Sequence, residues 1–395
     1  MTTGALPNQQ RQLLCWAIVG ALVLACGFGF APERTWSNLL IAAFYLLTIA
    51  LGGAVFLALT YISGAGWHVA FRRVPEAMAR ILPLAGAAML VVLGVRMHDY
   101  GWHHGEGDVG TFWFKELWLT PSFWATRAVV YVLLWSFMAG RLVARSQQQD
   151  ESGDAAISES NTRLSALFLI VYAITFSLAS VDWIMALEPM WFSTMWGVYN
   201  FAGMIQAALA VVIILGLLFR SKNEPLHGVF NDEHLHDLGK LLMGFSCFWM
   251  YIWFSQYMLI WYSNIPEETS YFISRTKGPW GPVVVVAIVV NWIIPFFVLL
   301  PKAAKRNAGV MMKIAVVVLI GRWIDLYLMV FPASPFDTAD VPFGSAPVFG
   351  IWEVGAIACL IGVVGCLLLR CFGASNSVPR NDPFLSESLN YHADG

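Results

Sequence analysis

Residues 38–62 read NLLIAAFYLLTIALGGAVFLALTYI, a long apolar run without Asp, Glu, Lys or Arg. A helix needs about 20 apolar residues to cross the roughly 30 Å of hydrocarbon in a bilayer, so this run can span a membrane. The rest of the chain repeats the pattern, because 58% of its 395 residues are hydrophobic and only 12% are charged. Lipid offers no partner to open backbone groups, so such spans must be helices. We therefore predict an all-α polytopic membrane protein.

About ten transmembrane helices are expected. The predicted spans are 12–31, 38–62, 77–96, 122–143, 163–185, 193–219, 238–263, 282–301, 309–331 and 347–371. They form a single integral membrane domain over residues 1–395, with four spans in 12–145, six in 162–372 and a tail at 373–395. The segment 146–161 is polar, and we expect a disordered cytoplasmic loop there. We find no sequence repeat across this loop.

The distribution of basic residues predicts the orientation. Ten crossings place both termini on one side, and that side holds sixteen of the 23 Lys and Arg residues, against six on the other. This bias matches the positive-inside rule, so both termini are expected in the cytoplasm of a bacterium, with the protein in its inner membrane. The run 13–31 is longer than a signal-peptide core, which favours a retained first span over a lipidated Cys26.

Composition also argues against several kinds of site. The net charge of −2 gives no reason to expect nucleic-acid binding. The six cysteines form no CxxC or CxxCH pattern, which disfavours an iron–sulfur cluster, a c-type haem and a structural zinc site. The eight histidines lie in loops, at span ends or in the tail, so none is placed to ligate a haem at depth. We expect no cofactor and no metal in this chain.

An aromatic run, FSCFWMYIWFSQYMLI (residues 245–260), is followed by WYSNIPEETSY (residues 261–271). In the predicted orientation this corner faces the periplasm, with Glu267 and Glu268 at the outer rim. Either glutamate could equally be a solvent-facing side chain that only keeps the loop hydrated. Four more carboxylates are expected in the outer third of the membrane or at its rim: Asp182, Glu188, Asp325 and Glu353, the last about two turns into its span.

Arg322 and Asp325 lie inside a predicted span, where each charge costs roughly 2.5–3.5 kcal/mol. They are three residues apart and share a helix face, so they can neutralise each other. One interpretation is a self-compensating pair packed between helices. The other is a polar station on a proton or quinone path, because carboxylate chains carry proton relays in pumps.

Other polar side chains within the spans are Arg127, Asn200, Gln206, Gln256 and Asn291. Each amide alone is more often an interhelical hydrogen-bonding group than a site. Pro295 is expected to kink its span and to free backbone carbonyls near Asn291.

Several long strings resemble the ActF-type membrane subunit of alternative complex III, a bacterial quinol:cytochrome c oxidoreductase. They are SVDWIMALEPMWFSTMWGVYNFAG (180–203), HDLGKLLMGFSCFWMYIWFSQYMLIWYSNIPEETSYFISR (236–275), NWIIPFFVLLPKAAKRN (291–307) and RWIDLYLMVFP (322–332). The resemblance covers roughly residues 180–331. This family belongs to the superfamily of NrfD and polysulfide-reductase membrane subunits.

The resemblance implies ten helices, with spans two to five and six to nine forming two four-helix bundles. It implies a redox-inert subunit of a respiratory complex that can supply a proton half-channel. The implied partners are a homologous ActC-type membrane subunit, where quinol oxidation is assigned, an iron–sulfur protein, haem c subunits and small membrane-anchor subunits. The family's polar positions correspond here to Asp182, Glu188, Glu267, Glu268 and Asp325.

Two alternatives remain open from the sequence. One is a quinone-binding subunit of the NrfD kind that works with a separate iron–sulfur protein. The other is a stand-alone secondary transporter, which ten spans and midplane polar residues permit.

Overall fold

The computed structural model describes residues 6–97, 100, 113–188, 190–333 and 347–392. In this part of the chain the regular structure is helical, and it contains no β-strand. The predicted fold class, an all-α polytopic membrane protein, is confirmed.

Each of the ten predicted spans corresponds to a helix or a helix series within the described residues. These are α1 (Leu6–Phe30), α2 (Pro32–Ile62), α3 (Arg73–Arg80) with α4 (Leu82–Val95), α6 (Pro121–Ser152), α7 (Ala156–Trp183), α8 (Trp196–Phe219), α9 (Asp232–Ser263), α11 (Gly281–Ile288) with η7 (Val289–Ile293) and α12 (Ile294–Leu299), α14 (Ala308–Val330) and α15 (Ile351–Gly373). Short helices connect them: η1 (Val69–Phe71), α5 (Trp113–Trp118), η5 (Met185–Leu187), α10 (Pro266–Thr276), η6 (Gly278–Trp280), α13 (Lys302–Arg306) and α16 (Leu385–Leu389).

Among the described residues, eight of these segments are long and apolar enough to cross a membrane by length and composition. The other two, α9 and α14, are equally long but less apolar by this measure. Helix α14 carries Lys313, Arg322 and Asp325, and α9 is rich in tryptophan and tyrosine. Both pack along α8 within the second set of helices. Of the three charged residues of α14 named above, Arg322 and Asp325 are buried, so they lie in the interior of the protein.

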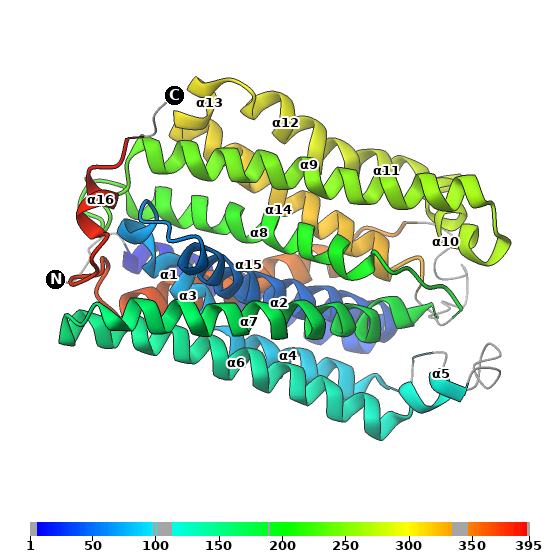
Figure 1. Ribbon diagram of the computed structural model, residues 1–395. Coiled ribbons are helices and arrows are strands. Elements are labelled where there is room, and N and C mark those ends of the chain that lie inside the picture. The colour runs from blue at the N-terminus through cyan, green and yellow to red at the C-terminus, as the bar shows by residue number, and fades with distance from the viewer. Residues whose placement is uncertain (1–5, 98–99, 101–112, 189, 334–346, 393–395) are drawn as a thin grey trace.

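The long helices form two four-helix bundles with a flanking pair (Figure 1). The first bundle contains α2, the α3–α4 series, α6 and α7, and the second contains α8, α9, the α11–η7–α12 series and α14. Helix α8 packs against α2 and α7 and so joins the bundles, while α1 and α15 pair with each other beside α2. This arrangement agrees with the one implied by the family resemblance.

The contact between α1 and α15 depends on small residues. The backbone of Cys359 lies directly over Gly20, and the backbone of Ala17 lies directly over Gly362, which leaves no room for a Cβ at either glycine. Close backbone approach of this kind is typical of helix pairs in membranes, where lipid removes the hydrophobic driving force for association.

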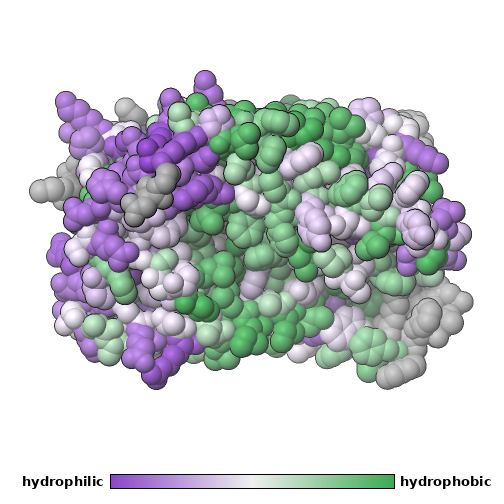
Figure 2. Space-filling view, turned by 45° about the horizontal axis from the view of Figure 1, so that its top comes forward, coloured by the Kyte–Doolittle hydropathy of each residue, from purple (hydrophilic) through white to green (hydrophobic). Residues whose placement is uncertain are grey.

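The two ends of the molecule differ in polarity. Both ends of the described chain and α16 lie at one end, which we call the tail end, and α5 and α10 lie at the other, the α10 end (Figure 1). Figure 2 shows a hydrophobic band between a strongly hydrophilic tail end and the opposite end. Such a band, long helices and an even number of crossings describe a multi-pass membrane protein.

The segment 146–161 is not the disordered loop expected from its composition. Helix α6 continues to Ser152 and α7 begins at Ala156, so only residues 153–155 separate them. Gly153 ends α6 in the left-handed conformation, which glycine adopts without steric cost. Tertiary contacts order the polar residues, because Gln149 donates to Ser158 at 2.8 Å and Asp150 accepts from Arg73 at 2.5 Å.

The expected distortion at Pro295 is present as a π-helical turn, η7. Proline has no N–H, so the carbonyl of Asn291, four residues earlier, loses its helical donor. The Gln206 side chain of α8 supplies the replacement, donating to Asn291 O at 2.7 Å. The kink is therefore coupled to a polar contact between helices.

Candidate functional site

Asp325 lies at the centre of a buried polar cluster in the second bundle, here called the Asp325 cluster. Arg322, one turn earlier on α14, donates through Nη1 to Asp325 Oδ2 at 2.6 Å. The Tyr199 hydroxyl of α8 donates to Oδ1, and Trp249 Nε1 of α9 lies 3.3 Å from Oδ2. Arg322 is 0% exposed and Asp325 is 2% exposed. Three helices thus converge on one carboxylate.

The position of the Arg322 guanidinium depends on α8. Asn200 Oδ1 accepts from Nη2 at 3.1 Å, which accounts for one intramembrane amide found in the sequence. Gly203, one turn further along α8, faces the guanidinium so closely that a Cβ there would collide with it. The Nε atom of Arg322 is buried and has no partner among the described residues.

A second cluster of the same composition lies in the first bundle, and we call it the Asp182 cluster. Arg127 of α6 donates to both oxygens of Asp182, through Nε at 3.1 Å and through Nη2 at 3.0 Å. Trp118 Nε1 donates to Oδ1 at 2.8 Å, and the Tyr131 hydroxyl lies 3.5 Å from Oδ2. The Arg127 guanidinium also sits over the Trp118 ring, 3.8 Å from its centroid.

The two clusters match in chain order and in chemistry. Asp182 is on α7 and Asp325 is on α14, which are the fourth helices of the first and second bundles. Each carboxylate meets one arginine, one tyrosine hydroxyl and one tryptophan N–H, although the arginines come from different helices. The sequence shows no repeat that would predict this similarity.

Glu188 and Arg275 form an ion pair at the α10 end of the second bundle, with Arg275 Nη2 2.5 Å from Glu188 Oε1. Arg275 is 4% exposed and also donates through Nε to the carbonyl of Leu328 at 2.8 Å. A cavity of about 20 Å³ lies between this pair and the Asp325 cluster, with Asp325, Tyr199 and Arg275 among its walls. A volume of this size holds about one water molecule.

The remaining predicted carboxylates do not join the Asp325 cluster. Glu267 and Glu268 lie in the first turn of α10, and neither side chain forms an ion pair within the described structure. Negative charge at a helix N-terminus is favourable in itself, so their position needs no further role.

Glu353 lies in the first turn of α15 rather than two turns into it, because the helix begins at Ile351. Its side chain is buried, and both of its carboxylate oxygens accept hydrogen bonds. Arg34 donates from Nε to Oε1 at 2.7 Å and from Nη2 to Oε2, Asn38 donates at 2.9 Å, and the backbone N–H of Gly350 donates at 2.8 Å. Glu353 therefore ties α15 to α2.

Polar side chains continue from the Asp325 cluster toward the tail end. Gln206 donates through Nε2 to Ser246 Oγ at 2.9 Å as well as to Asn291 O, and Asn291 donates to Ala287 O at 2.9 Å. The side-chain oxygens of Gln206 and Asn291 are buried without partners among the described residues. Gly321 of α14 makes room for the Asn291 amide, which a Cβ would meet. Gln256 lies apart from this set, and its buried Nε2 is also unpartnered within the described structure.

No set of three or more His, Cys, Asp or Glu side chains is arranged to hold a metal ion in the part of the chain that the structure describes. His98, His103 and His104 lie outside that part. His68, in the loop after α2, is buried, and this burial, reinforced by the nearby charge of Arg72, lowers its pKa to about 3.

Some members of the two clusters were missed by sequence reasoning. Trp118, Tyr131, Tyr199 and Trp249 carry no distinguishing sequence signal, because aromatic residues abound in the spans and at their ends. Arg275 falls between two predicted spans, where the sequence gives no sign of its partner. Their shared signal is tertiary, since each contacts a carboxylate far away in the sequence.

A scan against models of known protein families finds no match to this chain, and a search of curated proteins finds no significant relative.

Proposed function

We propose that this chain is a membrane subunit of a bacterial respiratory quinol:cytochrome c oxidoreductase complex and that its second bundle carries protons. The chain itself holds no redox cofactor in this proposal. Haem c and iron–sulfur clusters belong to partner subunits, which include an ActC-type membrane subunit, an iron–sulfur protein and small anchors. Support for the complex comes from the resemblance over residues 180–331, which contain the whole Asp325 cluster.

The observation that carries proton transfer is the position of Asp325. Its carboxylate is buried, is held by Arg322, and borders a water-sized cavity whose walls also include Arg275, the ion-pair partner of Glu188. A carboxylate in contact with a water molecule can exchange a proton with it. Arg322 stabilises the ionised form, and protonation of Asp325 would cancel that attraction and loosen the pair.

The inner half of the path would follow Gln206, Ser246 and Asn291. The side-chain oxygens of Gln206 and Asn291 have no partner within the described structure, and ordered water commonly satisfies such buried groups. Amide and hydroxyl groups do not ionise near neutral pH, so these side chains would position water molecules rather than bind a transferred proton themselves. Asp325 would be the one protonated station between the two halves.

Quinol oxidation in the partner subunit would drive the cycle. Moving one charge against 100 mV costs roughly 2.3 kcal/mol. The coupling must be conformational, because this chain has no redox group of its own in the proposal.

The decisive experiment measures the proton-to-electron ratio of the intact complex with Asp325→Asn. We expect electron transfer to continue and the ratio to fall. The matched control is Glu353→Gln, which also neutralises a buried carboxylate but at the α2–α15 tie, and should leave the ratio unchanged. An unaltered ratio in an active Asp325→Asn complex would refute proton transfer through this residue.

Membership of a complex is tested separately. A tagged chain, solubilised in mild detergent, is expected to bring haem c and iron–sulfur polypeptides with it, visible in a reduced-minus-oxidised spectrum. Isolation of a lone, colourless chain would contradict the subunit assignment and favour a transporter.

A second candidate, quinone binding, rests on a pocket of about 310 Å³ beside the Asp182 cluster. Its walls are largely apolar and include Trp118, Leu178, Trp191 and Asp182. An apolar pocket with one carboxylate suits a quinol head group, whose hydroxyl needs an acceptor. Photolabelling of this chain by a quinone analogue, abolished by Leu178→Trp, would favour this reading over a purely proton-conducting role.

A further inference from the structure

An apolar groove of about 370 Å³ lies outside both clusters, along α15. Its walls come from α1, α8, α14 and α15, and its floor from Tyr45 and Ile49 of α2. On α15 it extends from Ile357 to Leu369, roughly 18 Å at 1.5 Å per residue. The groove therefore runs parallel to the helices, across more than half of a hydrocarbon layer of about 30 Å.

The chemistry of the groove suits a hydrocarbon chain. The hydroxyl of Tyr45 is satisfied internally, because it donates to the carbonyl of Leu319 at 2.8 Å. Ile320 and Ile361, on opposite walls, are each 52% exposed. Within a membrane these side chains face lipid, so an acyl chain is the solvent available to fill the space between them.

A cavity of about 900 Å³ with both polar and apolar walls adjoins the groove at the tail end, and Leu369 belongs to the walls of both. The cavity is lined by Phe219 and Phe372, whose rings stack with centroids 4.1 Å apart, and by the tail segment 375–380. The groove thus leads from the apolar band to a partly polar cavity at the tail end.

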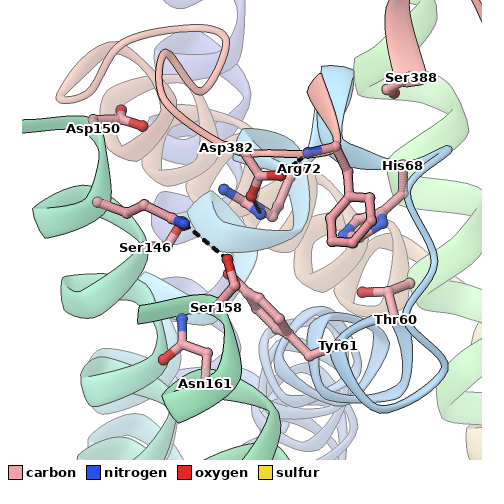
Figure 3. A network of polar contacts seen from close by, with 12 residues as sticks. Thr60, Tyr61, His68, Arg72, Ser146, Asp150, Ser158, Asn161, Asp382 and Ser388 are labelled. Carbon is pink, nitrogen blue, oxygen red and sulfur yellow. Dashed lines mark hydrogen bonds and ion pairs between the residues drawn. The ribbon is translucent and has the colours of Figure 1, made fainter. Parts of the chain in front are cut away.

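An ion pair and two hydrogen bonds hold the tail in the position that builds this cavity. Asp382 accepts from Arg72 Nη1 at 2.5 Å, and Figure 3 shows the two side chains facing each other across the tail and the start of α3. Asp150 of α6 accepts from the backbone N–H of Arg380 at 3.1 Å, and its carbonyl accepts from Asn381 at 2.9 Å. The wall formed by residues 375–380 is therefore a fixed part of the fold.

The surroundings of the cavity carry an excess of positive charge. Arg380 lines it, Arg370 lies between the wall residues Leu369 and Phe372, and Lys222 lies between Phe219 and Pro225. All three side chains are exposed, and none forms an ion pair with another described residue. Of the acidic neighbours, Asp382 is neutralised by Arg72, Glu224 is only 8% exposed, and Glu387 has its carboxyl group beside Gly66, so positive charge remains in excess.

We propose that the groove and the cavity together bind one anionic phospholipid, with an acyl chain in the groove and the phosphate in the cavity. The charge distribution selects this occupant, because the three cations attract a net negative headgroup more strongly than a zwitterionic one, whose own ammonium offsets its phosphate. The bound lipid would join α15 and the tail to the second bundle. This site is separate from the proposed proton path, and its test needs no proton measurement.

The first experiment fills the groove. The full chain is purified with its natural partners in mild detergent, and bound phospholipid is identified and counted by native mass spectrometry. Ile361→Trp is expected to remove the retained lipid, and Ile320→Trp on the opposite wall should do the same. The matched control is Ile170→Trp on the lipid-facing surface of α7, where the isoleucine is 62% exposed. Equal retention in the groove variants and the control overturns the proposal.

The second experiment tests the charge. Arg370→Gln with Lys222→Gln is compared with Arg141→Gln plus Arg163→Gln, which removes the same charge from α6 and α7 near the tail end. Each cation contributes about fivefold to anionic-lipid binding, so the first pair should lower the preference for phosphatidylglycerol over phosphatidylcholine by about 25-fold. The control should keep the wild-type preference. The same preference in both double variants would mean that the site does not recognise an anion.

Discussion

Asp182 and Asp325 occupy equivalent positions near the α10 ends of the fourth helices of two consecutive bundles. Each receives an arginine, a tyrosine hydroxyl and a tryptophan N–H. The Asp325 cluster borders a small cavity whose walls include Arg275, the ion-pair partner of Glu188, whereas the Asp182 cluster borders a larger, largely apolar pocket. The two carboxylates thus share the same kinds of hydrogen-bond partners but border different cavities.

Removing one partner of the buried Arg322–Asp325 pair should destabilise the protein strongly. Arg322→Met leaves the Asp325 carboxylate buried without compensation, which typically costs about 3–5 kcal/mol. Thermal unfolding in detergent would show this as a large decrease in Tm. The double variant Arg322→Met with Asp325→Met should recover most of the loss, because no charge then remains unpaired. A double variant as unstable as the single one would show that the pair itself stabilises the fold.

Gly203→Ala should disturb the Asp325 cluster without changing any polar group. The new methyl group would meet the Arg322 guanidinium, and overpacking of this kind costs about 1–3 kcal/mol. The matched control is Gly244→Ala in α9, where nothing lies within 4 Å of an added Cβ. That control should be neutral or slightly stabilising, since alanine favours helix by up to about 1 kcal/mol. Equal Tm values for the two variants would contradict the close contact.

Pro295→Ala should weaken the interaction between Gln206 and Asn291. The restored N–H at position 295 can donate to the Asn291 carbonyl, so it competes with the Gln206 side chain for that acceptor. We expect Gln206→Leu to cost about 1 kcal/mol in the wild-type chain and clearly less in the Pro295→Ala background. A double-mutant cycle on thermal stability measures the difference. Equal costs in both backgrounds would show that the π-helical turn has another cause.

His68 should make the protein less stable as the pH falls. Its pKa is near 3 in the folded chain and near 6.5 in the unfolded chain, because burial opposes its charge. Below pH 6.5 the unfolded state therefore binds the extra proton, and folding loses about 1.4 kcal/mol per pH unit until the pH approaches the folded value.

The variant His68→Asn tests this contribution. The asparagine amide can replace the ring Nδ1 as the group that contacts the Ala65 carbonyl, at 2.8 Å in the wild type, but it does not titrate. Thermal stability measured between pH 7.5 and pH 5.0 should fall less in the variant. Parallel pH profiles for the two proteins would argue that His68 is protonated in the folded state.

Part of this architecture could be predicted from the sequence because it depends on local composition. The run 38–62 becomes α2 since its length matches the hydrocarbon layer, and every other predicted span is likewise helical. The distortion at Pro295 was predictable because the missing N–H removes a hydrogen bond within the same helix. The segment 146–161 was misjudged for the complementary reason. Its polar residues are ordered by Arg73 and by the tail, which no local pattern contains.

The sequence by itself determined the number and kind of membrane-spanning helices and the identity of the costly polar residues inside them. Only the tertiary structure decided which of these residues meet. Arg127 was one polar residue among several until α6 and α7 placed it against Asp182, and Glu353 proved to be a tie to Arg34 rather than a member of a carboxylate chain. Burial makes a lone charge expensive wherever it stands in the chain, but its partner comes from another helix, and helix packing alone selects that partner.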